Sequence, residues 1–197
     1  METKSNNLTK RKIQAITTRK IIFDTAIELM EKSGFNGITI EEISQKAGVS
    51  VGAFYHYFKS KNDILLEIFK RIDEYFKTEI TGKLKYKSSI ENIEKYFQYY
   101  AKYNVDVGID MLKLLYFSSN KVFIIKKRYL LTLLLNLIKE GQLKGEITDK
   151  ISSREITDFL FTVARGTAYH WCISDAGFDL QKKMMSNIKR IIPTIRK

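Results

Sequence analysis

The 197-residue chain contains one cysteine, one proline and two histidines. A single cysteine excludes an internal disulfide, and the scarcity of proline, together with few alternating apolar and polar runs, favours a chain built from helices. No apolar run approaches the roughly 20 residues that a membrane-spanning helix needs. We therefore expect an all-α protein without membrane spans. The lack of a secretory signal peptide further predicts a reducing, cytoplasmic location.

Signatures of catalysis and of metal binding are also missing. The sequence has no G-x-S-x-G, no Gly-rich phosphate loop and no H-E-x-x-H, and so few Cys and His make a nucleophile–base pair hard to assemble. Asp106 and Asp110 would share a helix face, but no His or Cys joins them in sequence. Cys172 is interpreted as a small buried hydrophobic residue rather than a sensor thiol. The sequence predicts no enzyme, no cofactor and no metal site.

Positive charge, by contrast, is abundant. The chain has 34 Lys and Arg against 22 Asp and Glu, a net charge of +12. This balance suits a polyanionic partner, although a basic solvated surface without such a function is nearly as common. Residues 1–12 are polar and basic without helical periodicity. They are either a frayed terminus or a basic arm that contacts DNA phosphates or the minor groove.

Residues 39–61 carry the most specific local pattern in the chain. Thr39 and Glu42 have the spacing of a capping box, and apolar residues follow at helical intervals. Gly48 suits the left-handed conformation of a tight turn, and Ser50 suits the N-cap of a second helix. A helix, a turn containing Gly and a second helix predict the DNA-reading helix-turn-helix, whose second helix enters the major groove.

The run TIEEISQKAGVSVGAFYHYFKSKNDIL resembles the N-terminal signature of TetR-type transcriptional regulators, including its A-G-V-S turn, its aromatic-rich end and its F-x-S-K. The rest of the chain resembles that family only in length and helical layout. The resemblance implies two domains. Residues 1–60 would form a three-helix DNA-binding domain, and residues 61–197 a helical domain for effector binding and dimerisation.

The resemblance also implies which residues contact DNA. Four residues match positions that usually contact phosphates in the family: Thr39, Tyr55, Tyr57 and Lys61. Four more match the base-proximal start of the reading helix: Ser50, Val51, Gly52 and Ala53. The methyl groups of Val51 and Ala53 suit thymine rather than bidentate hydrogen bonding, so the base preference stays open. Where this chain has Tyr57 the family often has His, but a Tyr hydroxyl still donates to phosphate.

Beyond residue 60 the periodicity predicts further amphipathic helices, over residues 60–81, 88–103, 106–117 and 122–140. The last of these is apolar nearly all round, which is typical of a helix buried within a bundle. A second capping box at Ser152 and Glu155 begins the next helix, and Asp179 caps a final helix that ends at Pro193. These last two helices carry more apolar surface than one chain needs. That excess favours a symmetric dimer interface, which the family resemblance also implies.

An aromatic and methionine-rich set in the C-terminal part is the candidate lining of an effector pocket: Tyr96, Phe97, Tyr100, Tyr103, Met111, Leu115, Phe117, Phe123, Phe159 and Trp171. Pockets are lined chiefly by such groups, yet for any single residue the alternative is ordinary core packing. Arg165 and His170 lie on an otherwise apolar helix. Either would contact an effector carboxylate or phosphate, or else serve as an interface salt bridge or a satisfied core histidine.

The sequence therefore predicts a cytoplasmic, homodimeric transcriptional regulator of TetR type, a repressor that binds a near-palindromic double-stranded DNA operator. A small apolar or amphipathic effector would select a dimer conformation unsuited to the operator and so release it. The alternative is a basic interaction protein that binds anionic membranes or a protein partner, with DNA contact incidental.

Overall fold

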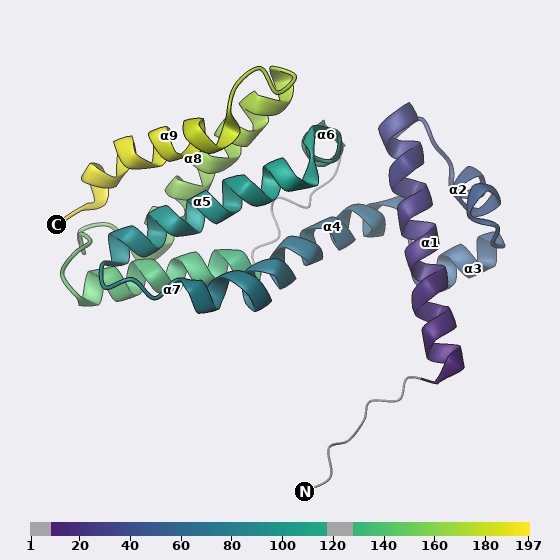
Figure 1. Cartoon of the computed structure of the whole chain (residues 1–197), viewed down its shortest axis with the longest axis horizontal. Coiled ribbons are helices and arrows are strands. Elements are labelled where there is room, and N and C mark those ends of the chain that lie inside the picture. Colours follow the sequence, from purple (N-terminus) through teal and green to yellow (C-terminus); the bar gives the residue numbers. More distant parts are fainter. Residues whose placement is uncertain (1–8, 118–127) are drawn as a thin grey trace, which may run out of the picture. The chain divides into compact units, whose positions relative to one another are not determined.

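The computed structural model of the chain describes residues 9–117 and 128–197 (Figure 1). Every regular element in these ranges is helical, which confirms the all-α prediction. The chain forms two compact units, an N-terminal unit of Met1–Glu67 and a C-terminal unit of Ile68–Lys197. The division falls inside one helix, α4, whereas the sequence placed it just before that helix begins. Helix α4 therefore belongs to both units.

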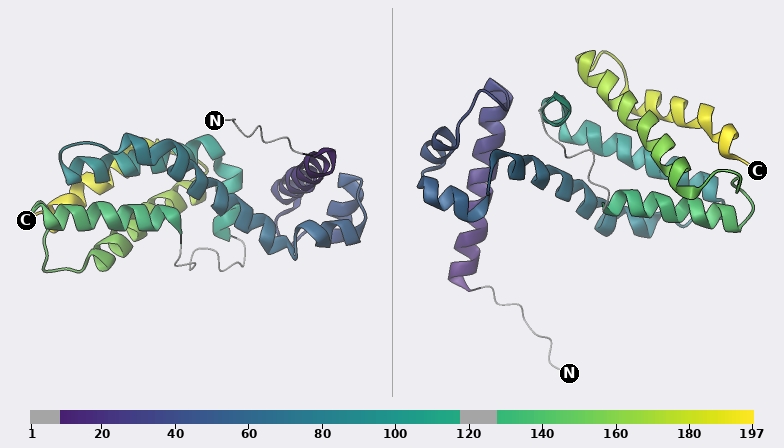
Figure 2. Two further views of the ribbon diagram at one scale, coloured as in Figure 1. Left: turned by 90° about the horizontal axis from the view of Figure 1, so that it is seen from below. Right: turned by 180° about the vertical axis from the view of Figure 1, so that it is seen from behind.

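The N-terminal unit consists of three helices and the start of a fourth: α1 (Lys10–Ser33), α2 (Ile40–Ala47), α3 (Val51–Tyr57) and α4 (Lys61–Tyr75). Helix α2 packs against both α1 and α3 (Figures 1 and 2). Helical spacing predicts a core of nine apolar residues for this unit, and five of them are buried, namely Ile22, Ala26, Ile43, Phe54 and Phe58. Four others are only half-buried, namely Leu29, Phe35, Ile40 and Val49. Phe23, Ile27, Met30, Ile38, Ile64 and Leu65 are buried as well.

Helix α1 begins earlier than its apolar pattern indicates. It starts at Lys10, so the last three residues of the predicted basic arm are helical, and residues 1–8 of that arm lie outside the described ranges. The first turns of α1 expose Ile13 and Ile16 instead of burying an apolar stripe. Because these exposed turns carry no apolar stripe, the spacing of apolar residues could not predict that they are helical.

The helix-turn-helix forms as the sequence predicts. The amide of Glu42 donates to Thr39 Oγ1 at 3.1 Å, and the amide of Thr39 donates to Glu42 Oε2 at 2.7 Å, which completes the capping box. Gly48 turns the chain in the left-handed conformation, with φ of 68°. Ser50 Oγ then accepts from the amide of Ala53 at 3.1 Å and caps α3. The direction of α3 is thus fixed by local hydrogen bonds at both ends of the turn.

The C-terminal unit continues from α4 through a π-helical segment (Phe76–Ile80) and a 3-10 turn (Thr81–Lys83) into five helices: α5 (Ser89–Val107), α6 (Ile109–Phe117), α7 (Tyr129–Leu143), α8 (Ser153–Ile173) and α9 (Leu180–Ile195). Helix α5 packs against α7 and α9, and α8 also packs against both of these helices (Figure 2). The capping box at Ser152 and the cap at Asp179 both form as predicted.

Several helix ends differ from those predicted. The break after α5 lies at Gly108, where φ is 93°, because only there does the backbone need a conformation that glycine adopts freely. Helix α7 is described from Tyr129, and the earlier part of its predicted range lies outside the described residues. Helix α9 continues through Pro193 to Ile195, which is buried. Loss of one backbone donor at proline does not end a helix whose last turn packs into the core.

Gly141 in α7 gives a test of the packing between the elements of this unit. A Cβ at Gly141 would lie 2.5 Å from Ile147 Cδ1 and 3.0 Å from Ser89 Cβ. We expect Gly141→Ala to lower the free energy of unfolding by about 1–3 kcal/mol through overpacking. Because Ile147→Val removes the nearest methyl group, the double variant should lose less than the sum of the two single losses in urea denaturation. A Gly141→Ala protein as stable as the parent would contradict this packing.

Candidate nucleic-acid interface and effector cavity

The start of α3 presents small side chains at the surface. Ser50 and Gly52 are exposed, and Val51 and Ala53 are half-buried. Towards the end of the helix, Tyr55 is 51% exposed and Tyr57 is half-buried. On the opposite face, Phe54 and Phe58 are buried, with ring centroids 5.9 Å apart, and anchor the helix in the core. The outer face of α3 therefore leaves room for a DNA backbone or a base edge to approach the helix closely.

Two of the residues matched to phosphate contacts are engaged within the N-terminal unit. Lys61 Nζ donates to the carbonyls of Phe35 at 2.8 Å and Ile38 at 2.5 Å, and it lies 4.9 Å from the centre of the Phe35 ring. Thr39 Oγ1 is part of the capping box. Lys61 thus fixes the connection between α1 and α2. Its ammonium has a third N–H for any phosphate. The sequence did not reveal this role because the two carbonyls lie more than 20 residues away.

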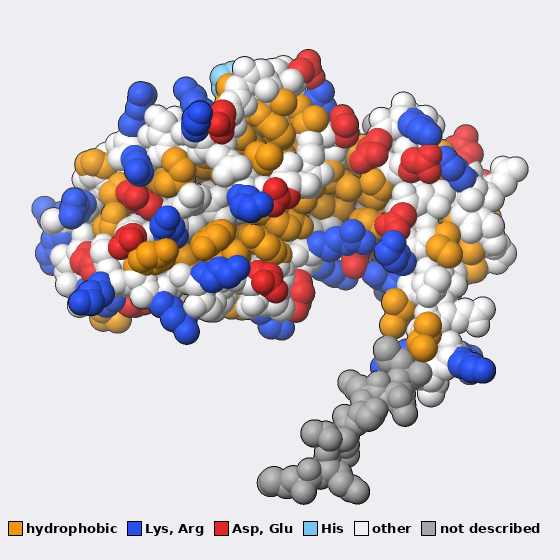
Figure 3. Space-filling model, viewed as in Figure 1, with side chains coloured by type: hydrophobic (Ala, Val, Ile, Leu, Met, Phe, Trp, Pro, Cys, Tyr) orange, Lys and Arg blue, Asp and Glu red, His pale blue; other side chains and the backbone are white. Residues whose placement is uncertain are grey.

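The net positive charge is not concentrated in the unit that contains the helix-turn-helix. Met1–Glu67 has 10 Lys and Arg against 8 Asp and Glu, a net charge of +2, and Ile68–Lys197 has 24 against 14, a net charge of +10. Figure 3 shows Lys and Arg side chains scattered over the visible face of the C-terminal unit, among Asp and Glu. Overall composition therefore does not locate a DNA-binding surface, which rests on the α3 geometry instead.

Acidic groups in the N-terminal unit are largely paired. Glu28 Oε1 accepts from Lys32 Nζ at 2.7 Å and from Lys46 Nζ at 2.8 Å, which lowers the pKa of Glu28 to about 2. Arg19 binds Glu67 of α4 in a bidentate manner, with bonds of 3.1 and 2.8 Å. This hydrogen bonding raises the pKa of Arg19, whose guanidinium also lies 4.8 Å from the centre of the Phe58 ring. Helix α4 is thereby attached to α1.

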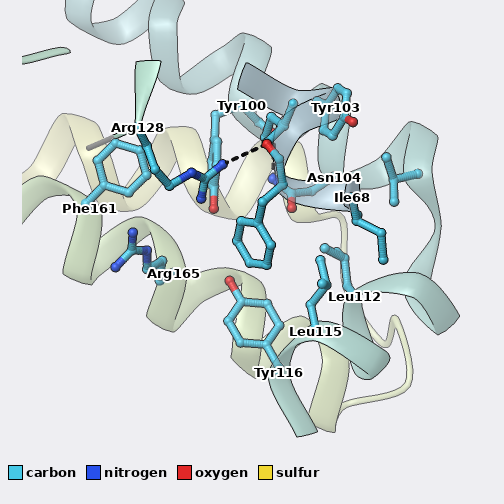
Figure 4. Close-up of a pocket in the computed structure, with 13 residues that line it drawn as sticks. Ile68, Tyr100, Tyr103, Asn104, Leu112, Leu115, Tyr116, Arg128, Phe161 and Arg165 are labelled. Atoms are coloured by element: carbon cyan, nitrogen blue, oxygen red, sulfur yellow. Dashed lines mark hydrogen bonds between the residues drawn. The ribbon is translucent and has the colours of Figure 1, made fainter. Parts of the chain in front are cut away.

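The C-terminal unit contains a cavity with an empty volume of about 450 Å³, its open mouth included. Residues of α4, α5, α6 and α8 line it, together with the residue that precedes α7: Ile68, Phe69, Ile72, Tyr100, Tyr103, Asn104, Val107, Leu112, Leu115, Tyr116, Arg128, Phe161 and Arg165. Figure 4 shows the Arg128 and Arg165 guanidinium groups on one side and Ile68, Leu112 and Leu115 on the other.

The charged groups in the cavity lining are both cationic. The Arg128 guanidinium lies 4.4 Å from the centre of the Phe69 ring, and the Arg165 guanidinium lies 5.1 Å from the centre of the Phe161 ring. Burial raises the pKa of Tyr116 well above its usual value, so this hydroxyl stays neutral near pH 7. Among the described residues, none of those that line the cavity carries a carboxylate. Such a cavity suits an amphipathic ligand with an anionic group and an apolar part.

The structure brings four of the twelve predicted effector residues to this cavity: Tyr100, Tyr103, Leu115 and Arg165. Tyr96 and Phe97 are fully buried in the core, where the Tyr96 hydroxyl donates to the carbonyl of Leu130 at 2.9 Å. Trp171 is also buried and donates to the Phe178 carbonyl at 2.9 Å.

The other predicted effector residues lie elsewhere. Met111 is half-buried outside the lining, and Phe159 and His170 are exposed on α8. The Phe117 side chain and Phe123 lie outside the described residues. The sequence missed Arg128, which ends the run Lys126-Lys127-Arg128 just before a long apolar stretch and so carries no signal of its own. It also missed Asn104 and Tyr116, whose spacing is that of ordinary helix positions.

Other candidate chemistry finds no support in the described residues. Cys172 is buried, and desolvation raises the pKa of its thiol to about 11, in keeping with a packed hydrophobic residue. No three His, Cys, Asp or Glu side chains in residues 9–117 and 128–197 come together around a possible metal position. Within the same ranges, no helix is both long and apolar enough to cross a membrane.

Comparison with known proteins agrees with this arrangement. The model for bacterial regulatory proteins of the tetR family matches residues 22–68, and the model for the C-terminal region of YsiA-like proteins matches residues 115–194. The fatty acid metabolism regulator protein of Bacillus subtilis (strain 168) is 30% identical over 172 residues, which cover 81% of this chain and 86% of that relative. The TetC protein of transposon Tn10 from Escherichia coli is 28% identical over 149 residues, covering 70% and 74%.

Comparison with solved structures shows that the fold is also shared with a transcriptional regulator. The crystal structure of the transcriptional regulator FadR from Bacillus subtilis in complex with stearoyl-CoA superposes with a TM-score of 0.75 and 25% identity. The match covers 89% of this chain and 98% of that one. With the capped α3 and the cavity, these matches show that the chain belongs to the TetR family of ligand-responsive, DNA-binding transcriptional regulators.

Proposed function

We propose that this regulator is a homodimeric repressor whose affinity for a near-palindromic operator is lowered by a long-chain acyl-CoA. The observation that carries the proposal is the pairing, in one chain, of an exposed reading helix with an amphipathic cationic cavity. Neither matching family model is catalytic, so we expect no enzymatic turnover of the ligand. The alternative of a module that binds membranes or protein partners finds no support among these matches.

The exposed face of α3 supports DNA reading in the major groove. Its first residues, Ser50–Ala53, carry no bulky side chain, so the backbone can approach base edges, and methyl groups there suit thymine. Tyr55 and Tyr57 follow with hydroxyls that can donate to phosphates, which set register and much of the affinity. In a dimer the two reading helices would engage half-sites about one helical turn apart, roughly 34–36 Å, or a multiple of that distance.

The exposed side of α8 supports dimerisation through the last two helices. Phe159, Tyr169 and Ile173 are 45%, 44% and 55% exposed, and their spacing places them along one face of α8. Gly166 lies on the same face, and a Cβ there would meet no heavy atom within 4 Å. A smooth apolar face of this kind is suited to close packing against its symmetry mate.

The cavity supports an acyl-CoA as effector. The similar B. subtilis FadR was crystallised with stearoyl-CoA, and the similar curated relative is a regulator of fatty acid metabolism. An acyl chain would pack against the apolar side formed by residues such as Ile68 and Leu112, and phosphate or thioester oxygens would accept from Arg128 and Arg165 (Figure 4). The net charge of +10 on the C-terminal unit would attract the polyanionic CoA group.

The reading role of α3 predicts that Tyr55→Phe weakens operator binding about tenfold or more, because a hydrogen bond to a charged acceptor contributes roughly 1.5–3 kcal/mol. Fluorescence anisotropy with the DNA upstream of the chain's own gene measures this loss. Tyr86→Phe, at an exposed tyrosine of the C-terminal unit, is the matched control and should bind as the parent does. Equal operator affinity in all three proteins would contradict the DNA role of Tyr55.

The effector assignment predicts that micromolar stearoyl-CoA raises the operator dissociation constant by about 5- to 150-fold, the usual range of allosteric coupling. The same titration with free CoA, which lacks the apolar chain, and with stearate, which lacks the phosphates, should have a much smaller effect. Operator binding that is unaffected by stearoyl-CoA would exclude this effector class while leaving the DNA assignment intact.

The dimer assignment predicts that Ile173→Asp shifts the protein towards the mass of one chain, 23.0 kDa, in sedimentation equilibrium. A buried aspartate in a symmetric interface would place two uncompensated charges close together. Leu143→Asp is the control, because Leu143 is 90% exposed and belongs to α7 rather than to either of the last two helices. A dimer that survives Ile173→Asp unchanged would place the interface elsewhere.

A further inference from the structure

Arg128 and Asp73 form an ion pair beside the cavity. Arg128 Nε lies 3.3 Å from Asp73 Oδ2, and Arg128 Nη2 lies 3.3 Å from Asp73 Oδ1. Arg128 Nη2 also donates to the Phe69 carbonyl at 3.2 Å, a bond drawn in Figure 4. The Arg128 side chain is only 6% exposed, yet it contributes to the cavity lining. The cavity wall thus contains a buried cation whose partner, Asp73, is not itself part of the lining.

This pair is looser than the other arginine–carboxylate pair on α4. Charge-assisted N–H···O bonds are usually about 2.7–2.9 Å long, and the shorter Arg19–Glu67 bond is 2.8 Å, whereas all three Arg128 bonds are 3.2–3.3 Å. Within the described ranges, Arg128 Nη1 has no acceptor. A guanidinium has five N–H donors, so Arg128 retains the capacity to bind a further anion.

Asp73 also joins α4 to α7. Its Oδ1 accepts from the amide of Leu130 at 3.2 Å, in the first turn of α7. The residue at the N-cap of α7 is Arg128, which has no side-chain oxygen to cap the helix, so Asp73 takes that role from a neighbouring helix. Helix α4 runs unbroken from Lys61 to Tyr75, and the same helix carries Glu67, which Arg19 holds in the N-terminal unit. A change at Asp73 therefore acts on a helix that both units share.

We propose that the Arg128–Asp73 pair is the switch through which the effector acts on α4. The proposal rests on the proposed function and extends it to the residues that couple the two activities. An anionic group of the effector accepts from Arg128 in place of Asp73. Asp73 is then a poorly solvated carboxylate without its cation, which is unfavourable, and α4 moves until the carboxylate is hydrated. The effector selects this state because it binds Arg128 more tightly when Asp73 no longer contacts the guanidinium group.

The test compares Asp73→Asn, Arg128→Gln and, as the matched control, Glu74→Gln, at an exposed carboxylate next to Asp73 on α4 and outside the cavity lining. Asp73→Asn keeps an oxygen for the Leu130 amide and removes the charge that competes for Arg128. Titration calorimetry with stearoyl-CoA should show about tenfold tighter binding for Asp73→Asn, about tenfold weaker binding for Arg128→Gln and no change for Glu74→Gln. Without effector, Asp73→Asn should also bind the operator several-fold more weakly than the parent.

Asp73→Asn with parental affinities for both stearoyl-CoA and operator would overturn the switch. If Asp73→Asn does not fold, the Asp73→Asn/Arg128→Gln double variant leaves no unpaired buried charge. It should fold and bind the operator equally with and without stearoyl-CoA, and release like that of the parent would overturn the proposal. A parent that binds the operator but not stearoyl-CoA would contradict the effector class instead. In that case the effector-free operator affinity of Asp73→Asn still decides whether the pair controls α4.

Discussion

Two arginine–carboxylate pairs on α4 are the contacts on which the rest of the account depends. Arg19 holds Glu67 in the N-terminal unit, with a shortest bond of 2.8 Å, and Arg128 holds Asp73 in the C-terminal unit, with bonds of 3.3 Å. Because the two carboxylates lie six residues apart on one continuous helix, we expect a displacement at one to reach the other through the helix backbone. The tighter pair joins α4 to the unit that reads DNA, and the looser pair lies beside the cavity. The difference in bond length between the two pairs suits a ligand that acts only on the Arg128–Asp73 pair.

The two units divide the chemistry between them. The N-terminal unit carries little net charge and derives its DNA-binding character from geometry: a capped turn, a left-handed Gly48 and a short helix that rests on Phe54 and Phe58. The C-terminal unit carries most of the positive charge, and Arg128 and Arg165 are the charged side chains among the described residues that line the cavity. In the proposed function, long-range attraction would favour an anionic ligand at the cavity, while short-range fit at α3 would determine contact with DNA.

The sequence predicted best those features that local chemistry determines. The capping boxes at Thr39 and Ser152, the turn at Gly48 and the cap at Ser50 each depend on a few neighbouring residues, and the structure confirms all of them. The all-α class likewise followed from periodicity. Helix ends were less accurate where packing rather than local preference decided them, as at Pro193, which α9 passes through because Ile195 is buried.

The cavity was predicted only in part, for a physical reason. Some aromatic residues of α5 pack in the core and others line the cavity, depending on the helix that each one faces. The helical spacing in the sequence therefore could not distinguish Tyr96, which is fully buried, from Tyr100, which lines the cavity. In the sequence, Arg128 is an ordinary cation just before an apolar helix. Only folding brings it to Asp73, which lies 55 residues earlier in the chain. The same holds for Lys61, whose carbonyl partners depend on how the chain between α1 and α2 folds back.

We propose that one helix, α4, links an effector in the cavity to DNA at α3, and thermodynamic linkage tests this coupling. The affinity for stearoyl-CoA is measured by calorimetry with the free protein and with the protein saturated by operator DNA. If the sites are coupled, operator must weaken stearoyl-CoA binding by the same factor by which stearoyl-CoA weakens operator binding, about 5- to 150-fold. The same stearoyl-CoA affinity in both states would show that the cavity and the reading helix are independent, and would contradict the account.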